Sequence, residues 1–288
     1  MKIAVLSDIH GNLPALEAVT ADIAAWQPDV VVVNGDVINR GPSNLACLQW
    51  VLRHQREAGW VLLRGNHEDY VLTSADPTIP RTGPKFELRQ FSEWTYQQVG
   101  TELMQELAAM PDRFGWRAPD GSTFLAMHGT VQGNRVGIYP QTTDEEIRPL
   151  IAPAPSLFVT AHTHRALIRQ VGHTTVVNIG SAGLPFDENQ QVGYGRFTWT
   201  ASAGWQAEVR RLDYDRQRAE LDMVTTGFLD EAGPFAPLVL VELRLALGLI
   251  GRWAKQYEAD FLQGEFGLAE SVGWYLAEHG YEAFSQRP

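Results

Sequence analysis

The sequence predicts an α/β fold followed by a helical C-terminal segment. Short aliphatic runs near the N-terminus alternate with longer segments in which apolar residues recur at helical spacing. This alternation is typical of β-α-β units built around a parallel sheet. Polar residues follow each aliphatic run directly, and the carboxyl ends of parallel strands are where open α/β sheets bind ligands.

The N-terminal elements are the clearest. The expected strands are runs of aliphatic residues short enough to be buried parallel strands, namely residues 3–6, 30–33 and 61–63. Between them we expect helices, because Leu16, Val19 and Ile23 share one helical face and Leu45, Leu48, Val51 and Leu52 share another. These helices are expected at residues 13–26 and 44–58.

The middle of the chain begins with a proline-rich turn region over residues 76–84, followed by a long helical pattern over residues 84–110. Further strands are expected at residues 123–127, 157–160, 175–179 and 196–200, with one helix at 143–151. Residues 205–212 alternate in the manner of an edge strand. Helices are then expected at residues 214–224, 238–257 and 268–279, separated by Gly and Pro residues.

The change of pattern near Leu212 predicts two domains, an α/β domain at residues 1–212 and a helical extension at residues 213–288. Apolar residues cover a broad front of the expected helix 238–257, which indicates that this helix is buried. It would pack on the α/β domain or form a subunit interface, so a homodimer is possible.

Composition excludes several classes of protein. The 288 residues include 23 basic and 34 acidic side chains, a formal charge of −11, which argues against stable binding of nucleic acid through a basic surface. The single cysteine, Cys47, rules out an intrachain disulfide and a thiolate-rich zinc site, and we expect it to be a small buried apolar residue. We find neither a signal-peptide pattern nor an apolar run of the ~20 residues that a membrane helix needs. We therefore expect a cytoplasmic protein without membrane contact.

Five short polar segments carry the candidate chemistry. Each follows an aliphatic run, so their side chains are expected to meet in one crevice. They supply seven candidate ligands, namely two carboxylates, one amide and four imidazoles, from Asp8, His10, Asp36, Asn66, His128, His162 and His164. His67 lies in the same segments but is not counted among these ligands. Oxygen and imidazole nitrogen without thiolate suit Mn, Fe(II) and Zn, and seven ligands exceed the tetrahedral set of one ion. The segments therefore predict a site for two divalent cations.

The same segments, taken in order, resemble the motifs of the calcineurin-like metallophosphoesterase superfamily: Asp8-x-His10, Gly35-Asp36 with Arg40-Gly41, Gly65-Asn66-His67-Glu68, His128, and His162-x-His164. They are most similar to its small bacterial and archaeal phosphoesterase branch, where Asn-x-Gly-Ser follows the last pair, as Asn178-Ile179-Gly180-Ser181 does here. The resemblance covers about residues 1–212. It implies a four-layer α-β-β-α sandwich with helices on both outer faces.

The resemblance also implies roles for the metal ligands. Asp8, His10 and His164 would hold the first metal ion, and Asp36 would bridge the two. The second ion would be completed by Asn66, His128 and His162. We expect manganese first, with iron, zinc or nickel as alternatives. A hydroxide bridging the two ions would then attack phosphorus in line.

Two further residues take catalytic roles from the resemblance. His67 would protonate the leaving alkoxide, and Arg40 would approach the phosphate, since a planar guanidinium suits bidentate recognition of oxygen. The alternative for Arg40 is an ion pair with Glu68 or another surface acid. The chain also departs from the family: the protein phosphatases have Asp where Asn39 stands, which argues against protein phosphatase activity, and Ala161 replaces a usual Gly.

Substrate-binding residues are sought in the segment that follows the Asn66-His67 loop, over residues 73–98. It combines aromatic and basic side chains, which could stack a base and bind a second phosphate. Arg81 and Lys85 are the candidates there, together with Asn39, whereas Phe91, Trp94 and Leu103 are expected to pack against the sheet.

The function predicted is hydrolysis of a phosphoester bond in a small, nucleotide-like substrate by a dinuclear metal site. Phosphodiesters, cyclic nucleotides and dinucleoside polyphosphates are the expected substrates, and phosphomonoesters are the nearest alternative. A different alternative is a non-catalytic protein that kept the fold and binds a partner protein.

Overall fold

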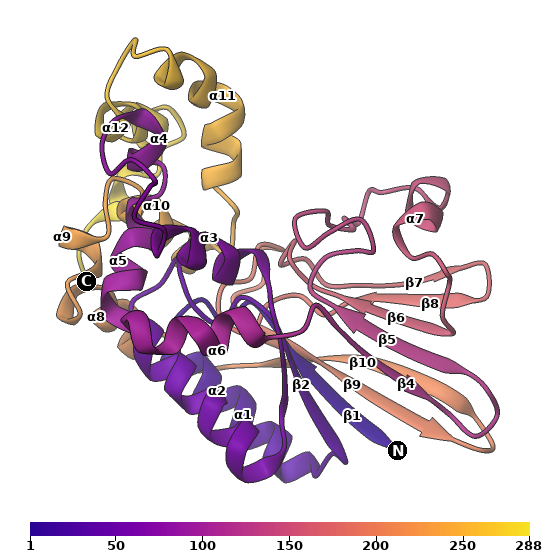
Figure 1. The fold of residues 1–288 in the computed structure, drawn as a ribbon. Coiled ribbons are helices and arrows are strands. Elements are labelled where there is room, and N and C mark those ends of the chain that lie inside the picture. The colour runs from indigo at the N-terminus through magenta and orange to yellow at the C-terminus, as the bar shows by residue number, and fades with distance from the viewer.

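Two five-stranded sheets lie face to face in the computed structural model, which describes residues 1–288 (Figure 1). Their strand orders are β10-β9-β1-β2-β3 and β4-β5-β6-β8-β7. Helices flank both sheets, so the expected four-layer α/β sandwich with a helical C-terminal region is confirmed.

The first sheet is built on the predicted N-terminal strands. β1 (Lys2–Leu6), β2 (Val30–Asn34) and β3 (Val61–Leu63) pair in parallel. β9 (Val192–Thr200) and β10 (Gly204–Leu212) extend the sheet as antiparallel strands beyond β1. The outer face is covered by α1 (Leu13–Trp26) and α2 (Asn44–Ala58), which lie side by side (Figure 1).

The second sheet contains a parallel centre with antiparallel edges. β5 (Thr123–Met127), β6 (Leu157–Thr160) and β8 (Thr174–Asn178) are parallel. The two edge strands, β4 (Arg113–Arg117) and β7 (Leu167–Val171), were not expected. Each has an exposed face and mixes charged with apolar residues, so neither gives a clear aliphatic run. α7 (Asp144–Leu150) packs on the outer face through Ile147.

Apolar side chains of both sheets meet in the core between them. Ile3, Val5 and Val32 of the first sheet share one buried cluster with Phe124 and Val159 of the second. Phe124 also lies against the rings of neighbouring aromatic residues, with centroid distances of 5.4 Å to Phe197 and 5.3 Å to Trp205. This core holds the two sheets together, and so sets how their strand ends meet.

The prediction of one long helix at residues 84–110 is wrong, because the segment breaks at Arg89 and at Gly100. The structure has α3 (Asn66–Ser74), α4 (Pro84–Glu87), α5 (Gln90–Val99) and α6 (Met104–Ala109) in this part of the chain. Gly100 has a φ of 75° and separates α5 from the turn before α6. α3 was not expected, and it places Asn66 and His67 on its first turn.

The prediction of one helix at residues 238–257 is also wrong. This part of the chain forms two helices, α10 (Ala236–Leu245) and α11 (Ile250–Leu262). α10 ends at Ala246, which has a left-handed backbone with φ 53°. The fully buried Glu242 side chain accepts hydrogen bonds from the backbone N–H groups of Leu249 and Ile250, at 2.6 and 3.0 Å. Its carboxylate therefore satisfies donors at the start of α11 that have no intrahelical partner.

The remaining C-terminal helices are α8 (Arg216–Thr225), α9 (Phe228–Glu231) and α12 (Leu268–Glu278). Leu240 and Phe228 share an apolar cluster with Trp94 and Phe186 of the preceding chain. The division into two domains at residue 212 stays a prediction. No helix combines the length and the apolar character that crossing a bilayer would require.

Phe124→Ala should destabilise the fold strongly, because it leaves a cavity between the two sheets where Phe124 is 1 % exposed. We expect a loss of about 3–5 kcal/mol in the free energy of unfolding, measured by denaturant titration followed by circular dichroism. The control is Ile168→Ala, at a side chain that is 49 % exposed, which should cost less than about 1 kcal/mol. Equal losses in the two variants would contradict the assignment of the core.

Candidate metal centre and active site

The seven predicted metal ligands lie at the carboxyl ends of strands from both sheets. Asp8 and His10 follow β1, Asp36 follows β2, and Asn66 begins α3 just after β3. From the second sheet, His128 follows β5, while His162 and His164 follow β6. The inter-sheet core aligns these ends, so residues far apart in the sequence meet at one edge of the sandwich.

The chain turns sharply at these positions. Five of the seven residues have a left-handed backbone, with φ between 48° and 64°: Asp8, His10, Asp36, His162 and His164. Such conformations are costly for residues other than glycine and cluster at functional sites. One glycine is required here for space: a Cβ on Gly65 would lie 2.6 Å from the backbone nitrogen of Asp36.

Glu68 holds two of these loops together. Its fully buried carboxylate accepts backbone hydrogen bonds from Asp36, Val37 and Gly65, each at 2.8 Å. Burial and the charge of Asp36 raise the pKa of Glu68 to about 7, while the N–H donors oppose that shift. Sequence reasoning missed this role of Glu68, although a glutamate at the third position of a helix is the spacing of a capping box.

Nitrogen and oxygen atoms converge in three overlapping groups. The ligand atoms within each group lie within 4.8 Å of one another, and the groups are Asp8, His10 and His164; His10, Asp36 and His67; and Asp36, His128 and His162. Asn66 joins the third group, since its Oδ1 is 2.9 Å from His128 Nε2. The structure therefore brings all seven predicted ligands together, and His67 with them.

Three of the imidazole rings are oriented by backbone carbonyl groups. The Nδ1 atom of His10 is 3.0 Å from the carbonyl oxygen of Asn39, and that of His128 is 2.9 Å from the carbonyl oxygen of Asn34. The Nδ1 atom of His164 contacts the carbonyl oxygen of Leu184. A carbonyl can only accept, so each Nδ1 donates, and in the neutral ring the lone pair of Nε2 then faces the cluster. This is the orientation of metal-binding histidines.

The carboxylates leave oxygen atoms unsatisfied in the same place. Asp8 Oδ1 and Asp36 Oδ2 are buried and have no hydrogen-bond partner. They lie 3.1 Å from His164 Nε2 and 3.2 Å from His128 Nε2, respectively. Buried lone pairs that face one another without protons are unfavourable unless a cation lies among them. The donor set, which is oxygen and imidazole nitrogen, fits divalent metal ions.

The electrostatics of the cluster agree with this fit. Burial opposes ionisation of Asp36, but the neighbouring His128 and His67 hold its pKa well below its usual range. Burial lowers the pKa of His162 to about 4, and burial with the neighbouring His67 lowers that of His10 well below its usual range. Against the effect of burial, the Asp36 carboxylate raises the pKa of His128 to about 10.

His67 is held by Asn39 beside the ligand cluster. The Asn39 side-chain nitrogen lies 3.0 Å from His67 Nδ1 and donates to Ser92 Oγ at 2.9 Å. Asn39 Oδ1 accepts from the backbone N–H of Arg40, which identifies the oxygen end of the amide. The amide therefore donates to Nδ1 and leaves the proton of neutral His67 on Nε2. Burial lowers the pKa of His67 to about 3, which favours the neutral ring.

Arg40 contacts an acid from the helical extension, the fully buried Glu242. Its Nε and Nη2 atoms donate to the two carboxylate oxygens of Glu242, at 3.2 and 2.6 Å. The guanidinium also lies 5.0 Å from the ring centre of Phe186, which stacks on His164. Arg40 thus forms an ion pair, which was the alternative to its contact with phosphate. Its partner is neither Glu68 nor a surface acid. A carboxylate inside an apolar helix was the only local signal for it.

Of the three expected substrate-binding residues, none is free beside the cluster. Asn39 is fully buried, and its amide is used within the protein. Arg81 pairs with Glu93 and donates to the Ser74 carbonyl, and Lys85 is exposed. Neither Arg81 nor Lys85 lines the two cavities that adjoin the cluster.

Arg40 and Gly251 line both of those cavities. One of about 410 Å³ includes Asn66 and His67 in its wall and is rich in aromatic side chains, from Tyr70, Phe91, Phe235 and Trp253. The other, of about 610 Å³, includes His162 and Thr163. Of these four aromatic residues, only Phe91 was expected from the sequence to pack against the sheet.

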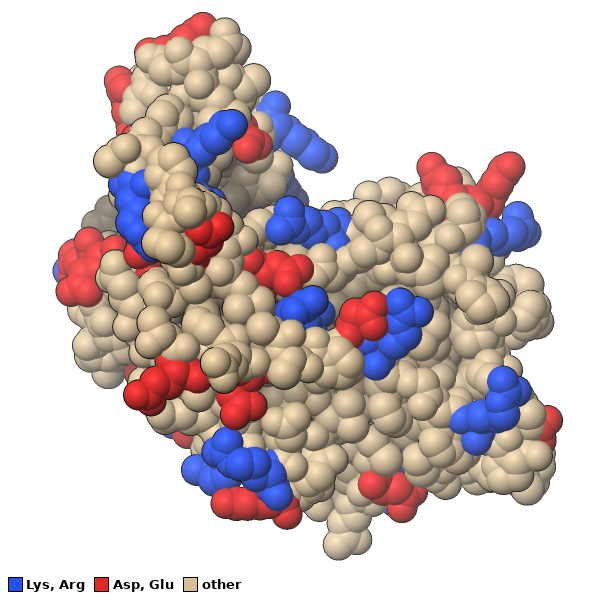
Figure 2. Space-filling view, in the orientation of Figure 1, with Lys and Arg blue, Asp and Glu red and all other residues tan.

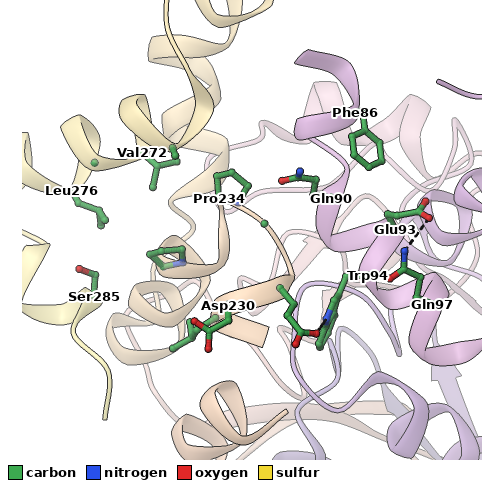
Figure 3. A pocket seen from close by; sticks show the side chains of 16 residues that line it. Phe86, Gln90, Glu93, Trp94, Gln97, Asp230, Pro234, Val272, Leu276 and Ser285 are labelled. Carbon is green, nitrogen blue, oxygen red and sulfur yellow. Dashed lines mark hydrogen bonds between the residues drawn. The ribbon is translucent and has the colours of Figure 1, made fainter. Parts of the chain in front are cut away.

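A cavity of about 750 Å³ lies elsewhere, between α5 and the C-terminal helices (Figure 3). Its wall contains the carboxylates of Glu93, Asp230 and Glu231 and none of the ligand cluster. Acidic walls disfavour a phosphorylated ligand, so its size does not make it the active site.

Comparison with known proteins agrees with the geometry. Residues 1–177 match the calcineurin-like phosphoesterase family. Symmetrical bis(5'-nucleosyl)-tetraphosphatases from Neisseria gonorrhoeae and Chromobacterium violaceum are 37 % and 32 % identical over 68 and 78 residues. These matches span 23 % and 26 % of this chain, and only 24 % and 27 % of the relatives.

Two solved structures share the fold. A metallophosphoesterase from Sphaerobacter thermophilus has a TM-score of 0.62 at 22 % identity, covering 79 % of this chain and 95 % of that one. A hypothetical protein from Pyrococcus horikoshii OT3 has a TM-score of 0.68 at 18 % identity, covering 82 % and 97 %. With the family match over more than half of its residues, the chain belongs to the calcineurin-like phosphoesterase family.

Proposed function

We propose that this protein is a metal-dependent phosphoesterase with a dinuclear centre. The observation that carries the proposal is the ligand cluster itself, in which inward-facing imidazole nitrogens surround two buried carboxylate oxygens without partners. Asp8, His10 and His164 would hold one ion. Asn66, His128 and His162 would hold the other, and Asp36, which belongs to two of the overlapping groups, would serve both.

Divalent cations at this position would lower the pKa of a water molecule and neutralise charge on phosphoryl oxygens. We propose manganese as the first choice, with iron, zinc or nickel as alternatives, since all accept this donor set.

The side chains around the cluster would position the substrate and move its protons. His67, with its proton on Nε2, can donate to the oxygen of a leaving group, and Asn39 keeps that proton off Nδ1. Arg40 can bind phosphate oxygen through the guanidinium nitrogen that Glu242 leaves free. Both lie next to the aromatic cavity, which would receive the leaving group.

For the substrate, we propose a phosphodiester or a dinucleoside polyphosphate. The similarity to symmetrical bis(5'-nucleosyl)-tetraphosphatases supports the second. The presence of two cavities that share Arg40 in their walls supports a substrate with two parts beyond the scissile bond. A phosphomonoester would fill only one of these cavities.

A substrate panel tests the proposed function. With Mn²⁺ the protein should hydrolyse bis(p-nitrophenyl) phosphate and diadenosine tetraphosphate faster than p-nitrophenyl phosphate, measured as kcat/KM. Chelation with EDTA should abolish turnover because no side chain is placed as a nucleophile, and added Mn²⁺ should restore it. Full activity after complete removal of metal would refute the metal-dependent reaction.

Asp36→Asn should remove metal and activity together. The amide keeps an acceptor for the His67 backbone N–H, which donates to Asp36 Oδ1 at 2.8 Å, so the loop can keep its shape. We expect turnover to fall more than the ~10–100-fold typical of residues that only support a ligand, with metal content measured by mass spectrometry. Asp260→Asn makes the same change at an exposed position and should change neither. Full metal content with near-normal turnover would contradict a shared ligand.

His67→Ala should affect substrates according to their leaving group. Loss of a general acid costs about 10²–10⁴-fold when the leaving group needs a proton. We therefore expect a large fall in kcat for phosphodiesters with an alkoxide leaving group and a much smaller one for p-nitrophenyl esters. His173→Ala, at an exposed position, is the control. The same loss for both leaving groups would argue that His67 acts as a ligand instead.

A further inference from the structure

The cavity of about 610 Å³ beside His162 is unusual in its charge. Four basic side chains, from Arg40, Arg165, Arg252 and Lys255, contribute to its wall, and no Asp or Glu does. The chain as a whole carries 34 acidic against 23 basic residues, so this concentration of positive charge runs against the composition. Figure 2 shows Lys and Arg side chains gathered along the hollow between the lobe that carries α11 and the part that carries α7.

Most of this charge is not neutralised within the protein. Arg40 pairs with Glu242, but no carboxylate lies within ion-pair distance of Arg165, Arg252 or Lys255. Arg165 lies 5.8 Å from the ring centre of Tyr139, and its Nη1 atom donates to the carbonyl oxygen of Thr163 at 3.5 Å, so the other N–H groups of its guanidinium remain available. Like charges brought together without counter-ions repel one another. Such a cluster is favourable when an anion occupies the space between them.

Two structural features place these cations near the proposed metal centre. Arg165 follows the ligand His164 directly, and His162 lines the same cavity. Arg252 and Lys255 are three residues apart on α11, so they project from one face of the helix. The first turn of α11, with Gly251 and Arg252, also lines the cavity, and the positive end of a helix dipole adds to the attraction for an anion.

We propose that this cavity is a second anion subsite, which binds phosphate groups joined to the scissile one in an oligophosphate chain. This inference rests on the proposed phosphoesterase function and narrows its substrate class to polyphosphate esters. The aromatic cavity on the His67 side would take the leaving group, and the basic cavity on the His162 side would take the rest of the phosphate chain. Arg40 lines both cavities and lies between the two halves of the substrate.

The test compares two double variants that lose the same charge. Arg252→Gln with Lys255→Gln removes two cations from the cavity. Arg53→Gln with Arg56→Gln removes two cations that are also three residues apart and exposed, but on α2, outside both cavities. Each Mn²⁺-loaded protein is assayed for kcat/KM with diadenosine tetraphosphate and with bis(p-nitrophenyl) phosphate. Tripolyphosphate is then titrated as an inhibitor of the second substrate.

We expect the cavity variant to lose about tenfold or more in kcat/KM for diadenosine tetraphosphate relative to its change for bis(p-nitrophenyl) phosphate, since contacts with charged groups are worth that much. Its inhibition constant for tripolyphosphate should rise by a similar factor. The α2 variant should behave as the wild type in both measurements. Metal chelation by tripolyphosphate would affect all three proteins equally and so cannot produce the difference.

Equal changes for the two substrates, or equal changes in the two double variants, would overturn the subsite. A cavity variant with wild-type kinetics on the tetraphosphate would overturn it as well. If the wild type hydrolyses neither substrate with any metal, the proposed function itself fails. If instead the wild type is active and the cavity variant has the same kinetics, only the proposed subsite fails.

Discussion

The buried carboxylate of Glu68 is the contact on which the geometry of the site depends. It joins the loop after β2 to the start of α3 by accepting backbone N–H groups from Asp36, Val37 and Gly65. These loops carry Asp36 and Asn66, so one residue sets the positions of proposed ligands from two strands. The left-handed conformation of Asp36, which would otherwise be unfavourable, is maintained by these bonds. Replacing Glu68 would therefore disturb the site without touching a ligand.

A second constraint is the number of lone pairs buried at the same edge. The core between the sheets aligns strand ends whose side chains present oxygen and nitrogen lone pairs to one another. Such a cluster costs folding free energy in the absence of a cation, because polar groups are desolvated without forming hydrogen bonds. Part of the favourable free energy of metal binding then offsets this cost, as is general when binding and folding are coupled.

Local patterns in the sequence predicted the central strands, the outer helices α1 and α2, and the convergence of the polar segments. They did so because aliphatic runs and the residues that follow them are near neighbours in the chain. The edge strands β4 and β7 were missed because an exposed edge needs no aliphatic run. The break between α10 and α11 depends on Glu242 folding back on Leu249, and the apolar pattern continues across it. Arg252 and Lys255 line the same cavity as Arg165, although Arg165 is far away in the sequence. No local sequence pattern predicts that these three residues lie close together.

The pairing of Arg40 with Glu242 has a consequence for how the protein is made. The two residues are 202 positions apart, and at synthesis rates of about 5–20 residues per second the acid follows the arginine by roughly 10–40 s. All seven ligand residues precede Glu242 in the sequence, so a nascent chain holds the complete ligand set while the orientation of Arg40 is still unset. The ribosome thus delivers the seven proposed ligands first, and the acid that orients Arg40 only as the last helices emerge.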